Sequence, residues 1–83
     1  MKTKRLEELE KVKIIIKTNY NIADCGIFNT RNIVGDPMVT VFEGEYFTVD
    51  ICFGWAYFEI FGANQKEWDL LEKFYEELGE TND

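Results

Sequence analysis

The sequence predicts an α+β fold: an antiparallel sheet of three to four strands, arranged as a meander, with a helix at each end of the chain. Apolar residues recur every three or four positions near both termini, which is typical of amphipathic helices. They alternate with polar residues over 38–61, as in half-buried strands, and Gly, Asn, Asp and Pro cluster between these segments. The 83 residues are enough for one domain, 1–83. We expect the C-terminal helix to pack on one face of the sheet, with the first helix beside it.

The first helix is predicted over residues 3–19. Thr3 suits the N-cap, because its hydroxyl can accept a hydrogen bond from a free amide of the first turn. The apolar positions of this segment share one face: Leu6, Leu9, Val12 and Ile16. The run 14–16 consists of three isoleucines, so part of the segment could form a strand instead.

A short strand is predicted over 23–29, where Cys25, Ile27 and Phe28 supply the apolar content. The longest loop follows and ends at Pro37, the only proline, which disfavours helix at the residue before it.

Three strands then form a meander, at 38–42, 46–53 and 56–61. The dipeptide Gly54-Trp55 suits a two-residue type II′ turn, which fixes the register of the last two strands. On one face the register pairs only apolar residues: Val49 with Ile60, Ile51 with Phe58, and Phe53 with Ala56. On the other face it pairs Thr48 with Phe61, Asp50 with Glu59, and Cys52 with Tyr57. The sequence leaves open which face of the strand at 38–42 packs on the core, because loops of two and three residues place opposite faces of this strand there.

The last helix is predicted to begin at a capping-box-like pair, Asn64 and Glu67, in which each side chain accepts the backbone amide of the other. Its apolar stripe consists of Trp68, Leu71, Tyr75 and Leu78, widened by Leu70 and Phe74. Gly79 suits the C′ position just beyond the helix end.

The composition argues against an enzyme and against a metal or cofactor site. The chain has no histidine and no serine, which removes the commonest general base, metal ligand and hydroxyl nucleophile. Cys25 and Cys52 are too few for structural zinc, and we expect both to be reduced thiols. No apolar run approaches the roughly 20 residues that cross a bilayer, and no apolar signal sequence follows the first residues. We therefore expect a cytoplasmic protein that is non-catalytic and binds no membrane.

Charge is divided unevenly along the chain. Residues 36–83 carry a net charge of −10 and residues 1–35 carry +3, which together give −7. A field of this kind attracts cationic surfaces and repels nucleic acid. The lysines of the first helix alternate with glutamates, so we expect no direct nucleic-acid binding and predict a basic, nucleic-acid-binding protein as the partner.

The predicted register makes Asp50 and Glu59 direct neighbours across two strands. Like charges in this arrangement destabilise a sheet unless a proton, a cation or a basic partner compensates them. Tyr57 is expected on the same face, and aromatic rings beside carboxylates suit a basic partner. Three alternatives remain open: a solvated face with basic side chains nearby, a face covered by the first helix, or a pair that holds a divalent ion or does acid–base work.

The last helix offers a second candidate contact. Glu72 and Glu76 carry like charges at i and i+4, and so do Glu76 and Glu80, which costs helix stability. These carboxylates serve either solubility or the occupation of phosphate-binding positions on a nucleic-acid-binding protein. Trp55, at the tip of a hairpin, either anchors in a pocket of the partner or folds back over the sheet edge.

In size, acidity and α+β build, the chain resembles the small acidic inhibitors that phages and mobile elements encode, a group that includes anti-CRISPR proteins. This resemblance implies an inhibitor that mimics nucleic acid and blocks the cationic groove of a nucleic-acid-binding protein or nuclease, as a monomer or weak homodimer. The partner-binding residues would be Asp50, Trp55, Tyr57, Glu59, Glu72 and Glu76. The alternatives are a small-ligand-binding protein that uses the aromatic sheet face, and a structural subunit that self-associates through a sheet edge or its exposed aromatics.

Overall fold

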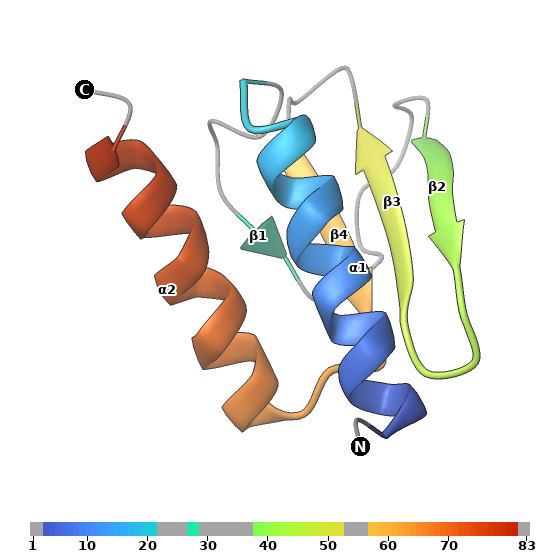
Figure 1. The fold of residues 1–83 in the computed structure, drawn as a ribbon. Coiled ribbons are helices and arrows are strands. Elements are labelled where there is room, and N and C mark those ends of the chain that lie inside the picture. Colours follow the sequence, from blue (N-terminus) through green and yellow to red (C-terminus); the bar gives the residue numbers. More distant parts are fainter. Residues whose placement is uncertain (1–2, 22–26, 29–37, 53–56, 82–83) are drawn as a thin grey trace.

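Two helices and a four-stranded sheet make up the fold, in the order α1, β1, β2, β3, β4, α2 along the chain (Figure 1). The structure is a computed structural model, and it describes residues 3–21, 27–28, 38–52 and 57–81. The helices are α1 (Lys4–Thr18) and α2 (Gln65–Thr81), and the strands are β1 (Ile27–Phe28), β2 (Met38–Glu43), β3 (Thr48–Cys52) and β4 (Tyr57–Phe61). The predicted α+β architecture is confirmed. The predicted turn at 54–55 and residue Cys25 lie outside the described residues.

The first helix begins where its cap predicts. Thr3 has extended backbone angles, and its hydroxyl oxygen accepts the amide of Leu6 at 3.2 Å, which satisfies a donor that has no partner within the helix. The helix ends at Thr18, and the amide of Asn19 donates to the carbonyl of Ile15 at 3.0 Å. The run of three isoleucines is therefore helical, and Ile16 continues the apolar face that is buried against the sheet.

The strands are ordered β1-β4-β3-β2 across the sheet. The register of β3 and β4 is the predicted one, with Asp50 opposite Glu59 and Ile51 opposite Phe58. The sheet also contains one parallel pair, since β1 runs parallel to β4 at the edge of the antiparallel meander.

The first hairpin differs from both of the alternatives that the sequence left open. The register shifts between Thr40 and Phe42, so Val41 is an extra residue on β2, as in a β-bulge. Val39 pairs with Ile51 and Phe42 pairs with Val49, and both partners are core residues. The bulge thus places Val39 and Phe42 on the same face of the sheet, although they are three positions apart. Strict alternation along a strand would place them on opposite faces.

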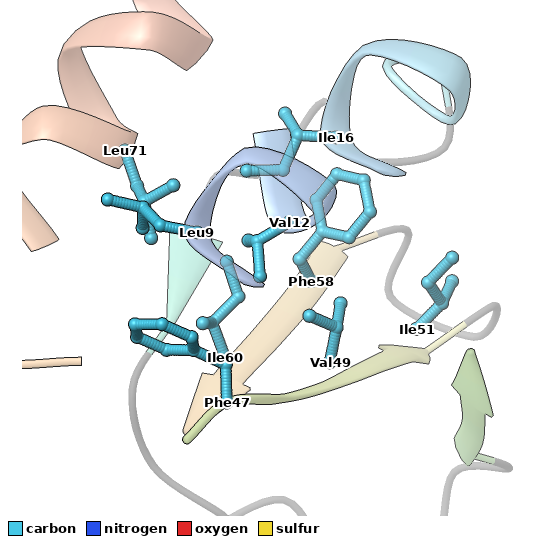
Figure 2. Close-up of a cluster of buried hydrophobic side chains, with 9 residues drawn as sticks. All are labelled: Leu9, Val12, Ile16, Phe47, Val49, Ile51, Phe58, Ile60 and Leu71. Carbon is cyan, nitrogen blue, oxygen red and sulfur yellow. The ribbon is translucent and has the colours of Figure 1, made fainter. Parts of the chain in front are cut away.

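Both helices lie on the same face of the sheet. Figure 1 shows α1 crossing in front of the strands and α2 beside α1, toward the β1 edge, and the two helices contact each other. The core lies between this helix layer and the sheet (Figure 2). It consists of Leu9, Val12 and Ile16 from α1, Leu71 from α2, and Phe47, Val49, Ile51, Phe58 and Ile60 from the sheet side. Each fully buried side chain of this kind stabilises the fold by about 1.5–3 kcal/mol relative to exposure.

The second helix has the predicted start and a different end. The amide of Glu67 donates to Asn64 Oδ1 and the amide of Asn64 donates to Glu67 Oε1, both at 2.9 Å, which completes the capping box. The prediction of Gly79 beyond the helix end is wrong, because α2 continues to Thr81. A Cβ atom at Gly79 would lie 2.7 Å from the Tyr20 hydroxyl, so the missing side chain leaves room for this ring.

Candidate functional site

The outward side of α2 carries a row of carboxylates. We call Asp69, Glu72, Glu76 and Glu80 the acidic stripe; all four are exposed, and they follow one another at intervals of three, four and four residues. These intervals keep the four side chains on one side of the helix. With a rise of about 1.5 Å per residue, successive carboxylates are spaced roughly 4.5–6 Å apart along the axis.

The acidic stripe keeps its charge within the described part of the chain. Glu72, Glu76 and Glu80 take part in none of the ion pairs between described residues. Asp69 accepts a hydrogen bond from the Gln65 amide at 2.8 Å, which leaves its charge in place. Lys73 is also exposed on α2 and reduces the local field, but four carboxylates outnumber it.

Two cations of α1 are instead held by carboxylates elsewhere. Lys4 Nζ lies 2.5 Å from Glu45 Oε2 in an exposed pair, which raises the pKa of Lys4 through a hydrogen bond to that carboxylate. Exposed pairs of this type contribute little stability. The pair therefore matters mainly because Lys4 neutralises Glu45, a carboxylate outside the acidic stripe.

Arg5 joins α1 to the start of α2. Its Nε donates to Glu67 Oε2 at 2.8 Å and its Nη2 donates to Glu67 Oε1 at 2.6 Å, a two-point contact. The same Nη2 donates to the carbonyl of Gly62 at 2.9 Å, and the guanidinium lies 4.9 Å from the ring centroid of Phe47. The hydrogen bond to Arg5 lowers the pKa of Glu67. Glu67 is therefore a structural residue and takes no part in the acidic stripe.

Glu8 is a second structural carboxylate, and it lies buried on α1. Its Oε1 accepts the amides of Tyr46 at 2.8 Å and Phe47 at 3.2 Å, and its Oε2 accepts the amide of Glu45 at 3.0 Å. These three successive amides form an anion-binding turn between β2 and β3. Burial alone would raise the pKa of Glu8, but the hydrogen bonds from the three amides outweigh it and lower the pKa below 4.5.

Asp50, Glu59 and Tyr57 are brought together but are not open to solvent. Asp50 and Glu59 are partners across β3 and β4, as predicted. Their exposed fractions are 5% and 2%, and that of Tyr57 is also 2%. The Thr40 hydroxyl donates to Asp50 Oδ1 at 2.7 Å. The expectation of an open, wet face is wrong, and so is the alternative that the first helix covers this face, since α1 packs against the opposite one.

The remaining predicted contact residues are Glu72, Glu76 and Trp55. Glu72 and Glu76 are exposed on α2, in contrast to the buried Asp50 and Glu59. Trp55 lies outside the described residues. Neither Arg5 nor Glu8 was predicted from the sequence. The available signal was their position on the buried side of α1, since Arg5 lies seven and Glu8 four residues before the core residue Val12.

Among the described residues, no group of three or more His, Cys, Asp or Glu side chains is placed to hold a metal ion. Cys52 is a buried free thiol. Neither described helix has both the length and the apolar content that a bilayer-spanning segment needs.

An open groove of about 370 Å³ lies between the two helices. We call it the helix groove; its lining residues are Glu10, Lys13, Ile14, Lys17 and Phe74. Lys13 Nζ lies 5.8 Å from the ring centroid of Phe74. The ligand-binding alternative predicts a pocket on the aromatic sheet face, whereas this groove belongs to the helix layer.

Comparison with protein-family models, with curated proteins and with solved structures gave no significant match for this chain.

Proposed function

We propose that this chain is a non-catalytic acidic binding protein that blocks the cationic surface of a nucleic-acid-binding protein or nuclease. One observation carries the proposal: the acidic stripe is exposed on a capped, packed helix, and its glutamates take part in no ion pair with the described residues. Carboxylates that stay charged at regular intervals offer a cationic groove the same kind of contact as a phosphate backbone.

The proposed contact centres on Glu72 and Glu76. Asp50, Glu59 and Tyr57 are too buried to reach a partner in this conformation, so the proposed contact does not include them. Trp55 stays a predicted contact residue. As with the small acidic inhibitors of phages and mobile elements, the encounter would take place in the cytoplasm.

The overall field supports the same partner class. The net charge of −7 repels nucleic acid at a distance and steers the chain toward basic surfaces. Steering of this kind depends on ionic strength, because charges separated by more than about 8–10 Å are screened at physiological salt.

The test is affinity capture from a bacterial lysate on the immobilised chain, at low and at high salt. We compare the parent with Glu72→Lys/Glu76→Lys and with a matched control, Glu7→Lys/Glu43→Lys, which makes the same charge change at exposed positions outside α2. We expect the parent and the control to retain basic nucleic-acid-binding proteins at low salt only. Retention of the same proteins by Glu72→Lys/Glu76→Lys would contradict the proposal.

A further inference from the structure

The turn between β2 and β3 binds the Glu8 carboxylate through three successive backbone amides. Oε1 of Glu8 accepts the amides of Tyr46 and Phe47, and Oε2 accepts the amide of Glu45. Figure 1 shows this turn beside the first half of α1. The Glu8 side chain is only 5% exposed, and a carboxylate at such a depth stays ionised where hydrogen bonds replace its water. The three amides therefore form a binding site for a carboxylate anion.

The conformation of this turn is also held by contacts that do not involve Glu8. The amide of Gly44 donates to the carbonyl of Phe47 at 2.8 Å, which closes the turn. At one end of the turn Glu45 forms an ion pair with Lys4, and at the other end Phe47 is buried in the core. We therefore expect the three amides to keep their directions when the Glu8 side chain is removed.

Gly44 limits the shape of the anion that fits this site. A Cβ atom at this position would lie 2.1 Å from Glu8 Oε1 and 2.7 Å from Glu8 Cδ, so the carboxyl group packs directly against the glycine. A planar carboxylate fits this space, whereas a phosphate carries further oxygens around its central atom. The site therefore favours carboxylates over tetrahedral anions.

We propose that this turn is a carboxylate-binding site that Glu8 fills from within the chain, and that a small free carboxylate occupies it when the Glu8 side chain is absent. Glu8→Ala removes Cγ and the carboxyl group, which together are the heavy atoms of an acetate ion. Acetate then restores the hydrogen bonds that the buried amides have lost. In the parent, the tethered Glu8 carboxylate outcompetes free acetate because its effective concentration is high.

This site does not depend on the proposed function. It is formed by α1 and the β2–β3 turn, whereas the acidic stripe lies on α2.

Chemical rescue of Glu8→Ala tests the proposal, by urea unfolding of the full chain at neutral pH. Relative to the same concentration of sodium chloride, about 0.5 M sodium acetate should lower the unfolding equilibrium constant of this variant about tenfold, as a dissociation constant of roughly 50 mM requires. The parent should change less than about twofold, the general effect of exchanging one salt for the other. Equal unfolding of Glu8→Ala in the two salts would overturn the proposal.

Two further variants show whether acetate acts at the turn. Val12→Ala, the matched control, also removes a buried side chain of α1, and it should respond to acetate no more than the parent. Glu8→Ala/Gly44→Ala should lose the rescue, because the added methyl group takes the place of a carboxylate oxygen. Rescue of Val12→Ala, or undiminished rescue of the double variant, would show that acetate binds elsewhere.

Sodium phosphate tests the class of anion. At equal ionic strength it should stabilise Glu8→Ala no more than it stabilises Val12→Ala. Rescue by phosphate as strong as that by acetate would contradict the assignment to carboxylates.

If Glu8→Ala is unfolded in chloride, the same titration measures refolding. Circular dichroism should then regain its helical signal as acetate is added, and no recovery at the highest concentration would overturn the proposal. In the folded variant, acetate should move the amide resonances of Glu45, Tyr46 and Phe47 more than those of other residues. Larger shifts elsewhere in the chain would refute the location of the site.

Discussion

Single carboxylates differ sharply in their roles in this molecule. Glu8 and Glu72 are both glutamates on amphipathic helices, and a charge pattern alone does not separate them. Glu8 lies on the buried side of α1 and accepts three amides of the β2–β3 turn. Glu72 faces solvent. Glu8 differs because it contacts a turn that lies 37 to 39 residues away along the chain. No local sequence pattern encodes such a contact.

The Glu8 contact predicts how stability depends on pH. The pKa of Glu8 lies below 4.5 in the folded state, so its contribution is present above that pH and is lost as pH falls through the lowered pKa. Glu8→Gln should lower the unfolding midpoint at pH 7 by roughly 5–10 °C and flatten the loss of stability as pH falls below the ordinary pKa of a glutamate. Thermal unfolding followed by circular dichroism measures both effects.

The control for that experiment is Glu7→Gln, an exposed neighbour on the same turn of α1. It should keep the parental pH profile. If Glu8→Gln also keeps it, the turn does not depend on the buried carboxylate.

Gly44 provides a second test of the same contact. A Cβ atom there would lie 2.1 Å from Glu8 Oε1 and 2.7 Å from Glu8 Cδ, so the glycine leaves room for the carboxylate. We expect Gly44→Ala to destabilise the parent by about 1–3 kcal/mol, in the range of overpacking. In a Glu8→Ala background the cost should fall to less than half of this, as a double-mutant cycle from urea unfolding would measure. Equal costs in both backgrounds would show that the two residues act independently.

At the scale of the element, the sequence patterns predicted most of what the structure contains. The Thr3 cap, the capping box at Asn64 and the register of β3 with β4 follow from local rules, because one side chain or one turn determines each. The bulge at Val41 could not be predicted from these local rules. It depends on how β2 pairs with β3, and alternation along a single strand carries no trace of an extra residue.

Gly79 illustrates the same limit. A glycine near the end of a helical pattern favours a helix end, yet here tertiary contact with Tyr20 explains the glycine and the helix continues. The Tyr20 ring lies 5.4 Å from that of Tyr75, so packing between distant segments outweighs the local signal.

The assignment of the two faces of α2 predicts a contrast between neighbouring leucines. Leu71 is fully buried in the core and Leu70 is half exposed. Leu71→Ala should cost about 2–5 kcal/mol of unfolding free energy, whereas Leu70→Ala should stay within about 0.5 kcal/mol of the parent. Urea unfolding at low protein concentration measures both values. Similar costs for the two substitutions would mean that α2 packs with a different side toward the core.

At the scale of the whole molecule, the structure separates carboxylates that serve the fold from carboxylates that remain available. Glu8 and Glu67 hold α1 to the hairpin and to α2, and Asp50 and Glu59 are buried on the second sheet face. The sequence predicted the pairing of Asp50 with Glu59 but assigned it to an open surface. Burial depends on what the whole chain packs against that face, which the period-two pattern does not determine.

The acidic stripe was the part of the candidate site that sequence could identify, since exposure on a capped amphipathic helix follows from the position of its apolar stripe. Whether those carboxylates bind a partner depends on the partner's surface. We propose that they compete with phosphate for a cationic groove.

The most direct measurement of that claim is a displacement titration. A basic protein captured by this chain is bound to a fluorescently labelled nucleic acid, and the chain is added while anisotropy is recorded. The parent should displace the nucleic acid, with an apparent affinity that falls steeply as salt rises, and Glu72→Lys/Glu76→Lys should displace none. Equal displacement by both proteins, or binding of the parent without displacement, would contradict the account.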